Sequence, residues 1–175
     1  MLFRSFVVNV NSPLKTAKDL LAKLKADPSS VSIALAAALG NANHIAISLA
    51  AKAAGADPKR FRIAVFNSSG ESITAVLGGH TELAVTTAGL LGPHVQAGKL
   101  RVLAVASRER MPGPLAQAPT LREQGIDVVF GSWRAMLGAR GISAEQVAYW
   151  EALAAKVNTQ EEWLQELAQI GRAHV

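Results

Sequence analysis

The sequence predicts an α/β domain with a mostly parallel sheet flanked by helices. Three observations lead to this class. Short apolar runs alternate with helical segments, glycine or proline separates most of them, and two helical segments follow one another near the C-terminus. Strand–helix–strand alternation is typical of parallel sheets, because a helix usually makes each crossover. With 175 residues, half of them hydrophobic, the chain is long enough for about one domain.

The first helix is expected soon after the N-terminal stretch. Ser12 is the expected N-cap, and Pro13 is the expected first residue, where its missing N–H costs nothing. Leucines and alanines then recur at helical spacing as far as Asp27-Pro28, which ends the helix.

The centre of the chain repeats a strand, a loop and a helix. The expected strands are Val31–Ala36, Arg62–Phe66, Glu82–Thr86 and Leu100–Ala106, and the expected helices are Ile45–Ala54, Glu71–Leu77 and Gly89–Ala97. Glycines follow all three helices, as is common at helix C-termini. The pattern therefore indicates successive βαβ units.

The last third begins with a short helix and an extended segment. Thr120–Glu123 has the capping-box pattern, Gly125 ends that helix, and Asp127–Trp133 is expected to be extended. Two further capping boxes, at Ser143–Gln146 and Thr159–Glu162, predict consecutive helices over residues 143–156 and 160–170. This helical pair either covers the sheet or belongs to a part of the fold that the chain lacks.

Composition excludes several classes of protein. The net charge is +5, but the basic residues are scattered and aromatic residues make up only 5%, so no nucleic-acid partner is predicted. The absence of cysteine excludes disulfides and thiolate metal sites. No apolar run approaches the roughly 18 residues of a membrane span. The opening MLFRSFVVNV lacks the apolar core and cleavage site of a signal peptide.

Three loops at the carboxyl ends of predicted strands carry small polar residues. The candidate ligand-binding residues are Gly40, Asn41, Asn43 and His44 in the first loop, Asn67, Ser68, Ser69 and Gly70 in the second, and Thr86 and Thr87 in the third. A strand-to-helix turn presents free N–H groups and the positive end of a helix dipole, where carboxylates and phosphates bind. The alternative is that these residues, Asn41 or Asn43 among them, only cap their helices.

Nothing in the sequence demands catalysis or a metal. The four histidines lack metal-ligand spacing, and no paired carboxylate lies near them. Ser68 and Ser69 are not in a nucleophile-elbow pattern. No catalytic residue, metal or cofactor is therefore predicted.

The order of these segments resembles the substrate-binding proteins of tripartite tricarboxylate transporters, the TctC or Bug type. The matching segments are Val7–Ala34, Gly40–His44, Ser69–Gly79, Pro93–Val105, Ala118–Gly125 and Ser132-Trp133. AGKLRVLAV followed by APTLREQG is the most specific part. The resemblance extends from about Val7 to Gly171.

The resemblance implies one lobe of a type II periplasmic binding protein, with most of the N-terminal lobe lacking. Residues 1–12 would form a crossing strand that leads into the lobe. Residues 13–127 would form the solute-binding second lobe. Residues 128–175 would form a return strand and C-terminal helices that belong to the other lobe.

The implied function is capture of a small organic carboxylate or amino acid in the periplasm for membrane permease subunits, without catalysis. By position, Gly40, Asn41 and His44 match the second-lobe loop of the family. Asn67–Gly70 stands where the family usually has Tyr-Lys-Gly, and Thr86-Thr87 stands where Asp-Asn is common. The alternatives are a ligand-sensing or interaction module coupled to a regulatory partner, and an α/β enzyme. The apolar faces of the C-terminal helices predict that they fold back on the lobe or form a homodimer.

Overall fold

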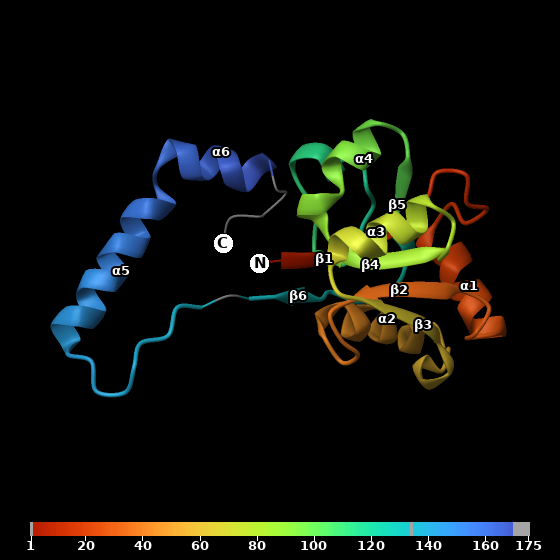
Figure 1. Ribbon diagram of the computed structural model, residues 1–175, viewed down its shortest axis with the longest axis horizontal. Coiled ribbons are helices and arrows are strands. Elements are labelled where there is room, and N and C mark those ends of the chain that lie inside the picture. The colour runs from red at the N-terminus through yellow and green to blue at the C-terminus, as the bar shows by residue number, and fades with distance from the viewer. Residues whose placement is uncertain (1, 134, 170–175) are drawn as a thin grey trace.

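The computed structural model describes residues 2–133 and 135–169, which form an α/β fold with an extended C-terminal arm (Figure 1). The strands are β1 (Leu2–Asn9), β2 (Ser32–Ala36), β3 (Arg62–Phe66), β4 (Leu83–Thr87), β5 (Leu100–Val105) and β6 (Gly131–Ser132). They form one sheet in the order β3-β2-β4-β1-β5, and β6 pairs with β1. The predicted fold class is confirmed.

The sheet is mostly parallel because one strand runs against the others. β2 pairs in parallel with β3 and β4. β1 pairs antiparallel with both β4 and β5, so β4 and β5 run in the same direction. The strand nearest the N-terminus thus lies inside the sheet, where Phe6 is opposite Val85 on one side and Ala104 on the other.

Helices cover both faces of the sheet. The α-helices are α1 (Ala17–Ala26), α2 (Ala42–Ala53), α3 (Ser69–Leu77), α4 (Gly92–Gln96), α5 (Ala144–Asn158) and α6 (Glu161–Gln169), and the 3-10 turns are η1 (Pro58–Arg60), η2 (Ala88–Leu90), η3 (Gly113–Leu115) and η4 (Arg122–Gln124). One buried cluster joins α1 and α2 to one face, and a second joins α3 to the other. Among the described helices, none is long and apolar enough to cross a membrane.

The first helix begins at Ala17, so the predicted start at Ser12-Pro13 is wrong. Thr16 is the N-cap, and its Oγ1 accepts the Asp19 N–H at 3.1 Å while Asp19 Oδ2 accepts the Thr16 N–H at 2.8 Å. This reciprocal pair satisfies two helix-end donors, whereas Ser12 Oγ accepts only the Leu14 N–H. The better-satisfied terminus lies four residues later.

Of the other three predicted capping boxes, two form and one does not. Ser143 and Gln146 form the predicted capping box at the start of α5, and Thr120 and Glu123 form the reciprocal bonds predicted before η4. The box at Thr159 is wrong, because the Thr159 hydroxyl donates to Lys156 O at 2.8 Å and closes the end of α5. Within the extended segment predicted after Ile126, Gly131–Ser132 is the part that forms a strand.

Helix α5 does not cover the sheet. Residues 135–143 lead away from the lobe, and α5 stands apart from the sheet while α6 returns toward η3 (Figure 1). No residue of α5 is buried, and Trp150 is 54% exposed. Within the described chain, α5 therefore does not fold back on the sheet, and its apolar face stays uncovered.

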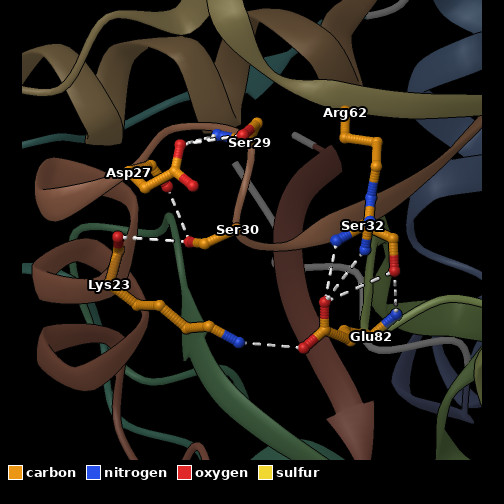
Figure 2. Close-up of polar contacts among 7 residues, drawn as sticks. All are labelled: Lys23, Asp27, Ser29, Ser30, Ser32, Arg62 and Glu82. Carbon is orange, nitrogen blue, oxygen red and sulfur yellow. Dashed lines mark hydrogen bonds and ion pairs between the residues drawn. The ribbon is translucent and has the colours of Figure 1, made fainter.

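Glu82 joins three elements at the edge of the sheet where the parallel strands begin (Figure 2). Its Oε1 lies 3.0 Å from Lys23 Nζ of α1, and its Oε2 accepts the Ser32 N–H of β2 at 2.9 Å. Arg62 Nη2 of β3 lies 3.6 Å from Oε2. Burial raises the pKa of Glu82, but the Ser32 hydrogen bond and the two cations outweigh it and hold the pKa below its ordinary value.

Glu82→Gln should lower the free energy of unfolding at neutral pH by about 1 kcal/mol, near the upper range for exposed ion pairs, since the side chain is 38% exposed. A lowered folded-state pKa stabilises the fold above the unfolded pKa, and this stabilisation disappears as the pH falls through the folded pKa. The difference between wild type and variant in urea unfolding should therefore shrink below about pH 4.5. Glu109→Gln is the control, and an equal loss at all pH values would contradict this role.

Candidate ligand-binding site

The three predicted loops open at one edge of the sheet. β2, β3 and β4 run parallel, with Ala36 opposite Phe66 and Ala34 opposite Ala84, so their carboxyl ends lie together. The loops after β2 and β3 lead directly into α2 and α3, and the loop after β4 leads into η2. This edge is where open α/β sheets place ligands.

The loop after β2 has an unusual backbone. Ala37 has φ 69°, and its N–H donates to Phe66 O at 2.8 Å, which ties the loop to the end of β3. A left-handed conformation is uncommon and costly for a residue with a Cβ, and strained residues are enriched at functional sites. Gly40 has φ +81° with open space around it, so the backbone conformation rather than crowding favours glycine there.

Asn41 is the N-cap of α2. Its Oδ1 accepts the N–H groups of Asn43 at 2.9 Å and His44 at 3.1 Å, and its Nδ2 donates to Ala36 O. His44 Nδ1 accepts the Gly40 N–H at 2.9 Å, which closes the loop on the first turn of the helix. Of the two asparagines left open by the sequence, Asn41 is the cap, and α2 begins three residues earlier than predicted.

Asn43 lies within the first turn of α2 and is only 8% exposed. It precedes the buried residues Ala46 and Ile47 by three and four positions, so it lies on the helix face that packs on the sheet. Its side-chain amide makes no hydrogen bond to any part of the chain that the structure describes. The amide atoms are not among the buried side-chain atoms that lack a partner, so this end of the side chain is open to solvent at the start of the helix.

The loop after β3 has the same design. Ser68 is the N-cap of α3, and its Oγ accepts the Glu71 N–H at 3.2 Å. Asn67 is exposed, and its N–H donates to Glu71 Oε2 at 3.1 Å. Ser69 and Gly70 form the first turn of α3, so their N–H groups precede the first intrahelical donors and point beyond the helix end.

The two threonines after β4 differ in position. Thr86 is fully buried on the α3 side of the sheet, opposite Ser5, and neither hydroxyl has a hydrogen-bond partner within the described chain. Thr87 is half-buried, faces the α2 side, and makes no side-chain cap bond to η2. Of this pair, Thr87 is the one that reaches the open edge.

The electrostatics of the edge favour an anion. The positive ends of the α2 and α3 dipoles point there, the loop after β2 contains no acidic residue, and Glu71 is engaged with Asn67. Arg4, at the start of β1, donates from Nη1 to Leu2 O and from Nη2 to Ser132 Oγ. No group of three potential metal-binding side chains is found in the described chain.

The TctC family model, described as the tripartite tricarboxylate transporter family receptor, matches residues 3–171. The chain belongs to this family. A TctC solute binding protein from Polaromonas is 25% identical with a TM-score of 0.77, over 99% of this chain and 60% of that one. The UPF0065 protein in the gbd 5′ region of Cupriavidus necator is 29% identical over 135 residues, which are 77% of this chain and 39% of that protein.

Two further proteins of similar fold were solved with ligands. A Rhodopseudomonas palustris protein with adipate has a TM-score of 0.82 at 23% identity, and MatC from the same species with bound malate has a TM-score of 0.80 at 20% identity. In each case the match covers 97% of this chain and 56% of the other. The chain thus has the TctC fold but spans little more than half the length of these relatives.

Proposed function

We propose that this TctC-family chain is the solute-capturing lobe of a periplasmic binding protein for a small organic carboxylate. The observation that carries the proposal is the meeting of two capped helix N-termini and Thr87 at one sheet edge. The captured solute would pass to permease subunits of a tripartite tricarboxylate-type transporter, the assembly from which the family takes its name. The relatives with adipate and malate support dicarboxylates as the first probes.

The mechanism is binding without covalent chemistry. Backbone N–H groups at the starts of α2 and α3 donate to carboxylate oxygens, and the helix dipoles favour the negative charge. The Thr87 hydroxyl adds a neutral donor at the edge. This edge contacts a ligand from one side, so it should bind at millimolar affinity at best, about −4 kcal/mol.

Asn41→Ala and Asn43→Ala should separate capping from binding. Asn41→Ala removes the cap of α2 and should lower the free energy of unfolding by about 1 kcal/mol. Asn43→Ala removes a side-chain amide that makes no hydrogen bond within the described chain, so stability should change little while binding of malate and adipate weakens. NMR titration should shift the amide resonances of Gly40–His44, Ser68–Gly70 and Thr87 in the wild type.

The matched control is Asn11→Ala, at the opposite edge of the sheet, which should change neither property. Ligand shifts that cluster away from the three loops would contradict the site. Equal binding by wild type and Asn43→Ala would remove Asn43 from it.

A further inference from the structure

The outer face of α2 carries exposed apolar side chains. On the inner face, Ala46, Ile47 and Ala50 are buried in the core beside the sheet. On the outer face, Ile45 is 41% exposed and Leu49 is 40% exposed. These two residues are four positions apart, so their side chains form one apolar ridge along the helix. A surface helix ordinarily presents polar residues on this side.

The ridge leads to a basic groove at the C-terminal end of α2. Ala53, one turn beyond the ridge, lines a groove of about 460 Å³ that also contacts α1, η4 and the residues that follow η4. Lys18 and Lys25 of α1 line the same groove and are exposed. The acidic residue that lines it, Asp127, is paired, with its Oδ1 3.1 Å from Arg122 Nε. The outer face of α2 is therefore apolar along its ridge and positively charged at one end.

The arm presents the complementary features. A groove of about 780 Å³ lies between α5 and residues 136–142, and most of the side chains that line it are apolar, Val147 and Trp150 of α5 among them. Helices α5 and α6 together contain five glutamates and one lysine, so this surface is acidic. One chain thus carries an apolar ridge beside lysines and an apolar groove beside glutamates.

The ridge and the arm groove lie apart within one molecule. Helix α5 stands on one side of the sheet, and α1 with its basic groove lies on the opposite side (Figure 1). We infer that the α5 groove of one copy binds the outer face of α2 of a second copy. Around a two-fold axis this contact is made twice, so both surfaces of both copies are covered and the assembly closes as a dimer. The glutamates of the arm and the lysines of the lobe orient the contact by their opposite charges.

Cross-linking at introduced cysteines tests this contact, because the chain has no cysteine of its own. Full-length Leu49→Cys protein is mixed with a tagged Val147→Cys protein and treated with a short bismaleimide. The mixture should give a cross-linked dimer that contains one chain of each kind, and each protein alone should give none. Leu90→Cys, at another exposed leucine of the lobe, replaces Leu49→Cys as the matched control and should give no mixed dimer.

Two results of this experiment overturn the inference. One is the absence of the mixed dimer. The other is a dimer formed by the Val147→Cys protein alone, because it means that α5 pairs with α5.

Sedimentation velocity tests the same contact without a cross-linker. Leu49→Glu should raise the dissociation constant of the dimer about tenfold or more, because it places a charge in the apolar arm groove of the other copy. Leu49 is exposed in the single chain, so the circular dichroism spectrum and thermal stability of Leu49→Glu should match those of the wild type. A folded Leu49→Glu protein that dimerises as tightly as the wild type overturns the inference.

Discussion

Replacing Phe6 with alanine should lower the free energy of unfolding by about 3–5 kcal/mol, the range for removing a buried aromatic side chain. Phe6 is 1% exposed on β1, which pairs with β4 on one side and β5 on the other. Its loss leaves a cavity between the sheet and α1–α2, and the close-packed core can collapse only in part. Urea unfolding followed by circular dichroism measures the change.

Phe61→Ala is the matched control for this prediction. Phe61 is half-buried and only packs against the margin of the same cluster, so its removal should cost clearly less. Equal losses for the two variants would contradict the central position of β1.

The chain should associate with itself through α5. Apolar side chains of α5 are 37–63% exposed, and Met136 and Leu137 of the arm are 70% and 92% exposed beside them. Large apolar patches seldom stay uncovered on soluble monomers, and exchange of an arm between copies is an economical way to form a dimer. Sedimentation velocity should show a concentration-dependent dimer.

Trp150→Glu should shift that equilibrium toward monomer, because it places a charge in the groove between α5 and residues 136–142. Leu90→Glu, at an exposed leucine of the lobe, should leave the equilibrium unchanged. A strict monomer at every concentration would contradict this prediction.

Local signals in the sequence predicted the elements well. The strand Arg62–Phe66 has the predicted bounds, because the turn before the apolar run and the polar loop after it determine both strand ends. The predicted capping box at Ser143 is confirmed, because the Ser143 and Gln146 side chains each accept the backbone N–H of the other residue. The helix start at Ser12 failed because a second acceptor, Asp19, gives Thr16 a better terminus.

The positions of the candidate site residues are predictable from the sequence where they depend on loops, and not where they depend on strand pairing. The sequence places polar capping residues after both strands, and the structure selects Asn41 and Ser68 as the caps. Arg4 lies opposite Thr87 only because β1 pairs with β4, a contact between residues more than eighty positions apart. The signal was present in the alternation of Arg4, Phe6 and Val8, which places a charge on the buried face of a strand. Burial of Thr86 follows from the same pairing.

The short pairing of β1 with β6 links the arm to the ligand edge mechanically. Leu2 lies opposite Ser132 and Phe3 opposite Gly131, and Arg4 donates to Ser132 beside them. If the arm and α5 rotate relative to the sheet, the chain must bend where β6 pairs with β1, next to the Arg4 guanidinium. A ligand whose binding at this edge shifts the ladder would therefore favour one arm orientation over others. By thermodynamic reciprocity, whatever holds the arm in that orientation raises the affinity for the ligand by the same factor.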